Sequence, residues 1–314
     1  MAVMDEPKIS VIVATLNRAH AISDCLESIS DAFKQADWKN GEIVLVDNGS
    51  TDDTQDIARK WSETSFVPLL LATEHKQGLS YARNAGIKNS SGDILLFTDD
   101  DCRVNENYIR QALDHFAKDR ESGLKTLRSG SVLLGNQDDL PLTIKPIKET
   151  KTWKRPLSVE DEGNLLGDSL IGCNMMATRE IVDQIGTFDE KLGAGSPCRA
   201  SEDTDYFYRA YLAGVTLQAV PNLTVYHYHG RKTEQDRRKL LENYAIGNGA
   251  LCLKYLFIYP RFSRHFYWDL KKYLLASAEE KRFEDGGRPS IGRRLRLQLQ
   301  GVFAYARQFL SFHS

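Results

Sequence analysis

The 314-residue chain has little of what marks secreted or membrane-spanning proteins. Its first residues, Met1 to Pro7, show neither the basic start nor the apolar core of a signal peptide. The longest strongly apolar run, Leu251 to Tyr259, is interrupted by Lys254 and is too short to span a bilayer. We therefore expect a cytoplasmic protein that is soluble or peripherally bound to the cytoplasmic membrane face.

Cysteines are few, and none forms a Cys-x-x-Cys pair, so the sequence predicts free thiols in a reducing compartment. No internal repeat or low-complexity segment is present either. The chain length allows one large domain or two modest ones. The five cysteines are Cys25, Cys102, Cys173, Cys198 and Cys252.

The net charge of −2 hides an uneven distribution of charge. Residues 231–314 contain 17 basic and 8 acidic residues, whereas the rest of the chain contains 24 basic and 35 acidic residues. A basic C-terminal region indicates an anionic partner, such as membrane headgroups, nucleic acid or an acidic neighbour. A solvated helical surface would explain it equally well.

Apolar runs rich in β-branched residues alternate with helical patterns over the first hundred residues. This alternation predicts a parallel sheet with helices on both faces. In such sheets, ligands bind beyond the carboxyl ends of the strands. The predicted strands cover Ile9–Ala14, Glu42–Val46, about Val67–Ala72 and Ile94–Phe97.

Polar residues follow three of these strands directly, in the segments Thr15–Arg18, Asp47–Ser50 and Asp99–Asp101. We expect the three segments to meet at one edge of the sheet. Three consecutive aspartates repel one another, so a positive partner is expected. Carboxylates suit Mg²⁺ or Mn²⁺, although an acidic turn or a helix-capping cluster would need no metal.

The second half of the chain is less regular. The polar stretch Gly135–Gly167 is too long for an ordinary connection and indicates a mobile lid or an acceptor-binding insertion. Beyond about residue 236 the pattern is helical. We expect a domain over 1–230, with halves 1–105 and 106–230, and a helical region over 231–314. Further strands are expected at Thr126–Leu134, Gly172–Ala177, Val215–Val220 and Leu223–Tyr228, and helices at Leu79–Lys88, Tyr108–Lys118, Arg179–Ile185 and after Ser201.

An ordered set of motifs resembles the family-two glycosyltransferases of GT-A fold. The set comprises Val11–Arg18, Val46–Asp52, Gly78–Asn84, the aspartate triplet and Glu202-Asp203, within residues 8–230. The resemblance implies a mostly parallel, Rossmann-like sheet flanked by helices. It also implies a metal-dependent enzyme that transfers a hexose or N-acetylhexosamine from a nucleotide diphosphate, most simply UDP, with inversion.

The resemblance assigns nucleotide contacts to residues at the strand ends. Asp47 would meet the base, but it could instead shape its own Asx turn. Arg83 suits a diphosphate, but it could instead form an ion pair with the triplet. Arg18 could equally be a surface helix residue. The nucleotide-binding candidates are Thr15, Asn17, Arg18, Asp47, Arg83, Asp99 and Asp100.

Asp101 is expected to be the direct ligand of Mg²⁺ or Mn²⁺, and Asp99 is expected to contact ribose or metal-bound water. A histidine after the last strand would complete the site. His227 is preferred to His229, with a packed or surface histidine as the alternative. Two further residues, Asn174 and Glu202, are candidates for contacts with the donor or acceptor sugar, although Asn174 could be a buried residue bonded to the backbone.

Asp203 is the candidate general base that takes the proton of the acceptor hydroxyl. A helix start would keep it ionised, but acidic residues are common there without any catalytic role. The expected acceptor is a glycan or a lipid-linked molecule, with no nucleic-acid partner. Aromatic and basic residues interleave from Phe262 to Leu274, which suits either an interfacial helix or packing against protein.

Two other functions compete with this interpretation. A sugar-nucleotide nucleotidyltransferase is disfavoured, because Ala14–Arg18 lacks the glycine-rich, lysine-bearing phosphate loop. A non-catalytic nucleotide-sugar-binding module would share the binding residues and would differ only in lacking transfer.

Overall fold

The computed structural model describes residues 6–156, 170–260, 264–277 and 289–310. The chain forms two compact units. The first unit comprises Met1–Gln77, Tyr81–Phe188 and Tyr206–Gly230. The second unit comprises Gly78–Ser80, Asp189–Asp205 and Arg231–Ser314.

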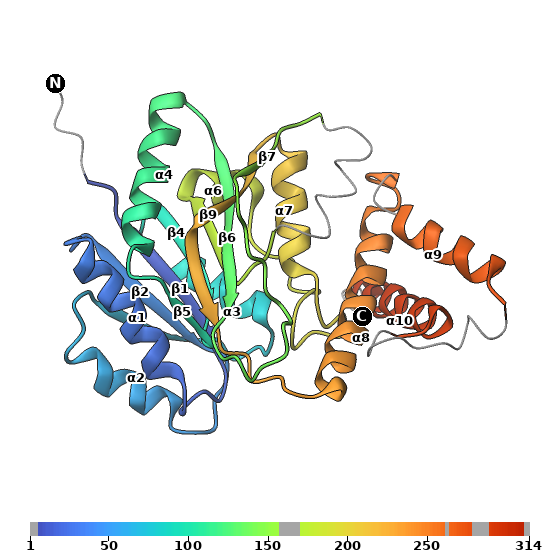
Figure 1. The fold of residues 1–314 in the computed structure, drawn as a ribbon, viewed down its shortest axis with the longest axis horizontal. Coiled ribbons are helices and arrows are strands. Elements are labelled where there is room, and N and C mark those ends of the chain that lie inside the picture. Colours follow the sequence, from blue (N-terminus) through green and yellow to red (C-terminus); the bar gives the residue numbers. More distant parts are fainter. Residues whose placement is uncertain (1–5, 157–169, 261–263, 278–288, 311–314) are drawn as a thin grey trace. The chain divides into compact units, whose positions relative to one another are not determined.

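A nine-stranded sheet in the order β3-β2-β1-β4-β8-β6-β9-β5, with β7 beside β9, is the centre of the first unit (Figure 1). Its first four strands are parallel, as the alternating pattern predicts. Three of them, β1, β2 and β4, are nearly continuous runs of buried residues because helices cover both faces, whereas β3, at the end of the sheet, is only partly buried. The four strands are β1 (Ile9–Thr15), β2 (Gly41–Asp47), β3 (Leu69–Thr73) and β4 (Ile94–Asp99).

The remaining strands enter the sheet in both directions. β8 (Asn174–Thr178) runs antiparallel to β4 and to β6 (Thr126–Leu134). β9 is a single strand, Thr216–His227, where two strands were expected. Its pairing with β6 shifts register between Gly130 and Ser131, so the sheet accommodates Pro221 without ending the strand. The sequence also did not predict the short strands β5 (Cys102–Val104) and β7 (Lys151–Trp153).

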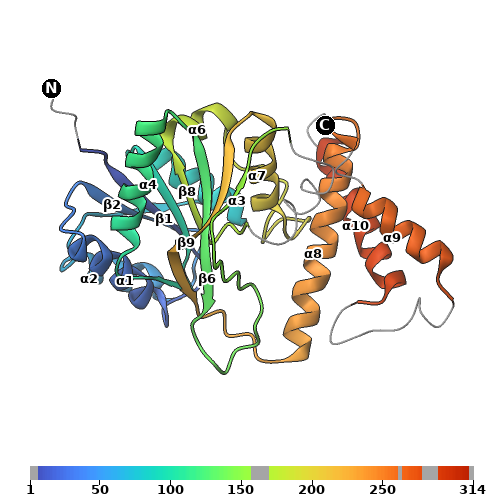
Figure 2. The ribbon, with the colours of Figure 1, turned by 45° about the horizontal axis from the view of Figure 1, so that its top comes forward.

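Helices pack on both faces of this sheet (Figure 2). On one face, α1 (Ile22–Gln35), α2 (Thr54–Ser62) and α4 (Tyr108–Ser122) join one apolar core with Val11, Leu45 and Leu96. On the other face lie α3 (Leu79–Asn89) and α6 (Arg179–Ile185). There Phe188 stacks on Tyr206 of α7 (Glu202–Leu212) at 4.1 Å and meets Phe97 of β4 edge-on. The predicted α/β class is confirmed.

The polar stretch after β6 is partly ordered by the sheet. Val132 forms an isolated bridge with Lys145, and β7 pairs with β9. Residues 157–169 lie outside the described residues. The role of the stretch Gly135–Gly167 as a lid or as an acceptor-binding insertion therefore stays a prediction.

The second unit consists mainly of the helices α8 (Glu234–Tyr255), α9 (Arg264–Leu275) and α10 (Ile291–Leu310). A capping box between Thr233 and Asp236 begins α8. α8 and α10 approach so closely that a Cβ on Gly301 would lie 1.8 Å from the carbonyl oxygen of Ile246. Among the described helices, none is long and apolar enough to cross a bilayer.

Candidate functional site

The polar segments after β1, β2 and β4 meet at the carboxyl edge of the sheet. Thr15 lies opposite Asp47, and Ala14 lies opposite Asp99 in the strand register. Backbone bonds then tie the loops together, because Asn17 N donates to Ser50 Oγ at 2.8 Å and Thr51 N donates to Asn17 Oδ1 at 2.8 Å. Asn17 adopts a φ of 55°, which asparagine tolerates better than most residues.

Asp47 is fully buried at the end of β2. Gln55 Nε2 donates to its Oδ2 at 2.7 Å, and Ser50 N lies 3.2 Å from the same oxygen. The Asx-turn alternative is therefore present in the structure. Contact of the Asp47 carboxylate with a base stays a prediction. A bound base would share this carboxylate with Ser50 N and Gln55 Nε2.

Arg18 bridges two members of the aspartate triplet. Its Nε donates to Asp100 Oδ1 at 3.0 Å, and its Nη2 donates to Asp101 Oδ2 at 3.1 Å. Burial raises the pKa of Asp100 to about 6, although the charge of Arg18 opposes that rise. Arg18 thus holds the turn that carries the triplet, a role that the sequence did not predict.

Arg83 of α3 reaches Asp99, with Nη2 3.0 Å from Oδ1. Only 4% of the Arg83 side chain is exposed, compared with 29% of the Asp99 side chain. The guanidinium also lies over the ring of Phe188. The ion-pair alternative for Arg83 is therefore realised, and its contact with a diphosphate stays a prediction. Part of the Asp99 carboxylate remains accessible to solvent.

Asp101, the last residue of the triplet, directly precedes β5 and lies near the end of β9. Cys102 of β5 pairs with His227 of β9, so Asp101 lies beside that histidine. His227 Nε2 is 3.1 Å from Asp101 Oδ1. His229, after the end of β9, instead faces Asp139, with Nδ1 3.7 Å from Oδ2. The structure thus places His227 rather than His229 at the aspartates.

The pair of Asp101 and His227 fits a divalent cation by donor type. A carboxylate oxygen and an imidazole nitrogen are both accepted by Mn²⁺, and Mg²⁺ takes carboxylate oxygen at about 2.1 Å. His227 Nε2 and Asp101 Oδ1 lie in hydrogen-bond contact at 3.1 Å, so a bound cation would replace the proton between them. Arg18, Arg83 and His227 already face the three carboxylates, so a cation is not required to hold the triplet.

The charge on His227 should be visible in the pH dependence of stability. Burial alone would lower its pKa, but the hydrogen bond and negative charge of Asp101 raise that pKa to about 9. Stabilisation from this proton is complete below about pH 6.5, the ordinary value, and is lost as the pH rises to about 9. In EDTA, wild-type protein should lose about 3 kcal/mol of stability across that range through this group.

Denaturant unfolding of the His227→Gln variant at pH 6 and pH 9 measures this effect. The variant should lose less stability over the range than wild type does. His20→Gln, at an exposed histidine, is the matched control and should behave as wild type. Equal pH slopes for wild type and His227→Gln would refute the charged pair.

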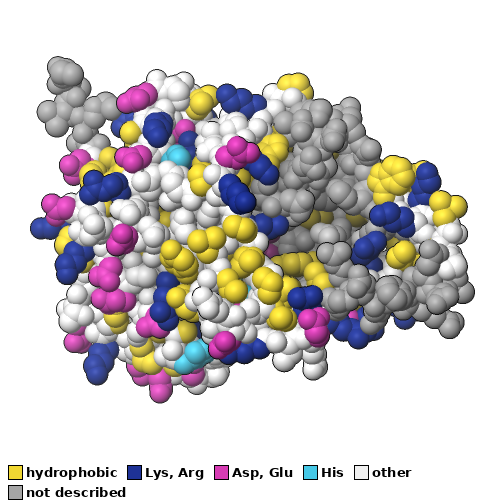
Figure 3. Space-filling model, in the orientation of Figure 1, with side chains coloured by type: hydrophobic (Ala, Val, Ile, Leu, Met, Phe, Trp, Pro, Cys, Tyr) yellow, Lys and Arg dark blue, Asp and Glu magenta, His cyan; other side chains and the backbone are white. Residues whose placement is uncertain are grey.

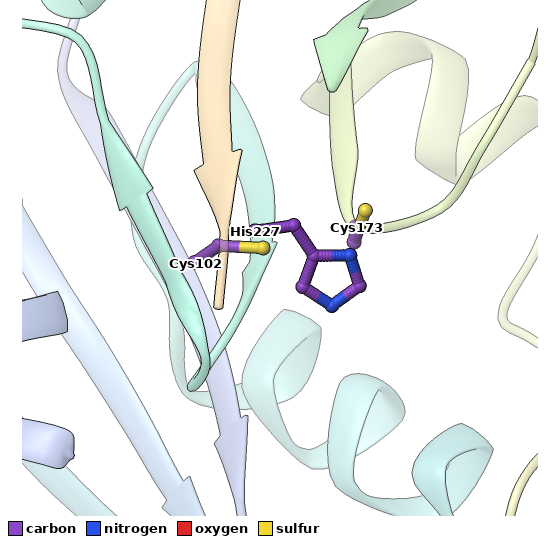
Figure 4. A group of neighbouring side chains, drawn as sticks. All are labelled: Cys102, Cys173 and His227. Carbon is purple, nitrogen blue, oxygen red and sulfur yellow. The ribbon is translucent and has the colours of Figure 1, made fainter. Parts of the chain in front are cut away.

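Two buried thiols, those of Cys102 and Cys173, lie beside His227 (Figure 4). Donor atoms of Cys102, Cys173 and His227 all lie within 4.8 Å of one another. A hydrogen bond with Cys173, together with burial, raises the pKa of the Cys102 thiol well above its ordinary value. Sulfur donors suit Zn²⁺ rather than Mg²⁺, so the Asp101 side of His227 is the side that suits a hard cation.

Asn174 lies in the core rather than on the site surface. It is fully buried, and its Oδ1 accepts a hydrogen bond from the hydroxyl of Tyr108 at 2.9 Å. Its Nδ2 donates to the carbonyls of Ser131 at 2.9 Å and Leu223 at 3.0 Å. The alternative of a buried asparagine bonded to the backbone is thus present in the structure, and the sugar contact of Asn174 stays a prediction.

Glu202 and Asp203 belong to the second unit, in the first turn of α7. Glu202 is buried and packs against Gly193, where an added Cβ would lie 3.2 Å from the Glu202 side chain. Asp203 is partly exposed, and its Oδ1 accepts a hydrogen bond from Thr204 N at 2.6 Å. In the same turn, Asp205 is buried and paired with Lys254 at 2.7 Å, a structural role. The roles of Glu202 and Asp203 stay predictions.

The model of glycosyl transferase family 2 matches residues 10–186, and this chain belongs to that family. The match includes the three strand-end segments and Arg83 but ends before Asp203 and His227.

Two curated relatives match the chain over about a third of its length. Glycosyltransferase AglE of Haloferax volcanii is 36% identical over 108 residues, which cover 34% of this chain and 34% of AglE. Glycosyltransferase GlyA of Streptococcus pneumoniae is 38% identical over 104 residues, 33% of this chain and 14% of GlyA. The matches thus span a minor part of these relatives.

Solved structures resemble the chain over nearly its whole length. The mannosyltransferase PcManGT of Pyrobaculum calidifontis, in complex with GDP-Man and Mn²⁺, has a TM-score of 0.55 at 18% identity, covering 98% of this chain and 75% of its own. TarS 1-349 of S. aureus in complex with UDP has a TM-score of 0.53 at 18% identity, covering 97% and 92%. At this identity the likeness shows a shared fold, which is the GT-A type.

Proposed function

We propose that this chain is a metal-dependent, inverting glycosyltransferase with a nucleotide-diphosphate sugar as donor. The donor is a UDP-linked hexose or N-acetylhexosamine, and the acceptor is a hydroxyl of a glycan or a lipid-linked molecule. The observation that carries the proposal is the Asp101–His227 pair, with 3.1 Å between donor atoms, at the edge where Thr15, Asp47 and Asp99 end their strands.

Asp101 and His227 would hold a Mg²⁺ or Mn²⁺ ion, and the partly exposed Asp99 would contact ribose or a metal-bound water. When bound there, the ion supplies positive charge to the diphosphate leaving group. PcManGT carries Mn²⁺ with its nucleotide sugar, which supports a divalent ion in this fold. Arg83 keeps a guanidinium at the end of β4, where its charge would also favour the diphosphate.

The acceptor side of the reaction needs a base. As the acceptor oxygen bonds to the anomeric carbon and the bond to the diphosphate breaks, the hydroxyl proton passes to a carboxylate. We assign that role to Asp203. Asp203 lies in the first turn of α7, and its side chain is partly exposed.

A thermal-shift panel tests the donor class. Wild-type protein is heated with UDP, UDP sugars, GDP-mannose or ATP, each with Mn²⁺ and with EDTA. We expect UDP compounds to raise the Tm only with Mn²⁺. A ligand at a hundred times its Kd adds about 2.7 kcal/mol of stability. A larger rise in Tm with GDP-mannose than with UDP compounds would change the assigned base from uracil to guanine. No rise in Tm with any nucleotide would overturn the proposed function.

A further inference from the structure

A groove in the second unit lies between α10 and the loop before α7. It has a volume of about 1160 Å³. The loop contributes Pro197 and Arg199, and α10 contributes Arg296, Leu299, Phe303 and Arg307. The α10 residues recur at helical spacing, so they form one face of that helix. All of these residues belong to the same compact unit.

The charge of the groove is of one sign. Of the described residues that line it, three are arginines and none is acidic. Within the described part of the chain, Arg199, Arg296 and Arg307 form no ion pair with a carboxylate, and Arg199 Nη1 reaches only the amide oxygen of Asn243, at 3.4 Å. α10 itself contains four arginines and no aspartate or glutamate. Uncompensated guanidiniums at one concave surface attract anions, and phosphate above all.

The same surface is also apolar. Phe303 is 63% exposed and Leu299 is 42% exposed between the arginines of α10. Pro197 adds apolar surface from the loop. A soluble phosphate compound would leave these side chains in water, whereas an amphiphile would cover them.

The loop is held in a fixed conformation. Arg199 and Ser201 have φ angles of 64° and 76°, in the left-handed region that non-glycine residues seldom adopt. Hydrogen bonds stabilise this turn, including Arg199 N to Ser196 Oγ at 3.2 Å. From α10, Gln308 Nε2 reaches Cys198 Sγ at 3.4 Å. Arg199 is therefore presented to the groove by a preorganised turn.

A second apolar surface occurs in this unit near the end of α8 and along α9. Phe257 and Ile258 are 86% and 67% exposed, and Leu274 and Leu275 are 69% and 77% exposed. Over α9, Figure 3 shows basic and apolar side chains side by side. Exposed aromatic and aliphatic groups beside basic ones are typical of helices that lie in a membrane interface.

We infer that the α10 groove binds the phosphate headgroups of anionic phospholipids and attaches the second unit to a bilayer surface. The arginines bind phosphate, and Leu299 and Phe303 enter the region of the acyl chains. Membrane attachment adds a partner for the C-terminal helices to the proposed function. It rests on the proposed function only in that attachment would bring the enzyme to a lipid-linked acceptor. Binding itself requires no donor or metal.

Vesicle sedimentation tests the inference with the full-length protein. Vesicles of phosphatidylcholine alone are compared with vesicles that contain 30% phosphatidylglycerol. Wild type should prefer the anionic vesicles, and the Arg199→Gln, Arg296→Gln, Arg307→Gln triple variant should bind them on the order of 100-fold more weakly, since each basic residue near the surface contributes about tenfold or less. Phe303→Ser alone should also weaken binding.

The matched control removes three exposed lysines from the first unit, as Lys34→Gln, Lys60→Gln and Lys88→Gln. It lowers the net charge equally and should bind as wild type does. Equal losses in both triple variants would show that only net charge matters and would overturn the site. Release of the protein by 10 mM inorganic phosphate at constant ionic strength would also overturn it, by identifying a free-phosphate site.

Two readouts separate this test from the donor chemistry. The arginine variant should retain the wild-type Tm and the wild-type shift with UDP and Mn²⁺. Loss of vesicle binding with an intact UDP shift supports the groove. An intact UDP shift in a wild type that ignores anionic lipid overturns the groove and leaves the proposed function standing.

Discussion

Replacing Asp203 by asparagine should lower the rate of sugar transfer by ~10³-fold, within the range that a positioned general base contributes. The amide keeps the shape of the side chain but cannot take the acceptor proton. Since we assign nucleotide binding to other residues, the Kd for UDP should stay within about twofold of the wild-type value. Transfer kinetics and UDP calorimetry on the same preparation measure both quantities.

Glu180→Gln is the matched control for Asp203→Asn. Glu180 is also an acidic residue in the first turn of a helix, α6, where it pairs with Lys125. If Asp203 only stabilises its helix, the two variants should show similar small effects. A transfer rate for Asp203→Asn within a few-fold of Glu180→Gln would remove Asp203 from the mechanism.

Replacing Asp101 by asparagine should lower transfer by ~10³-fold or more, because ionic stabilisation of a leaving group contributes several kcal/mol. The substitution removes a carboxylate that faces Arg18 and His227 at 3.1 Å each. The metal requirement should change with it, so that Mn²⁺ no longer enhances activity or nucleotide binding. Activity at a series of Mn²⁺ concentrations measures the effect.

Asp139→Asn is the matched control for Asp101→Asn. Asp139 faces His229 as Asp101 faces His227, so both variants leave a buried histidine without its carboxylate. Asp139→Asn should be destabilised yet keep its response to Mn²⁺. If both variants lose that response, general damage to this end of the sheet explains the result better than a metal site does.

The edge of the parallel sheet could be predicted from the sequence because its signals are local. Each strand is a short apolar run, and the polar residues that follow it must lie at the carboxyl end. The structure places Thr15, Asp47 and Asp99 there in neighbouring strands. The order of the strands in the sheet was not predicted, because the alternation of strands and helices alone does not fix it.

Residue type alone did not decide between binding and structural roles. Arg83 is suited to phosphate by the same bidentate fork that suits it to Asp99, and Asp47 accepts hydrogen bonds from its own turn as readily as from a base. Asn174 shows the limit most clearly, because its three bonds to distant residues were invisible in a local pattern. Only tertiary contacts separate these cases.

The neighbourhood of His227 depends on pairings between distant parts of the chain. The three-residue strand β5 sets the register that brings Cys102 and Asp101 to His227, and such a short strand leaves hardly any periodic signal. Cys173 lies in the turn just before β8, 71 positions after Cys102, so no spacing rule could connect them. Sequence order favoured His227 over His229, but only the β9 register shows which histidine meets Asp101.

Calorimetric titration of UDP into wild-type protein, once with Mn²⁺ and once with EDTA, measures whether a cation takes part in nucleotide binding. If Asp101 and His227 hold a cation that binds the diphosphate, UDP should bind at least tenfold more tightly with Mn²⁺. In Asp101→Asn the two titrations should give the same weak affinity. An equal Kd for UDP in Mn²⁺ and in EDTA with the wild-type protein would contradict the account.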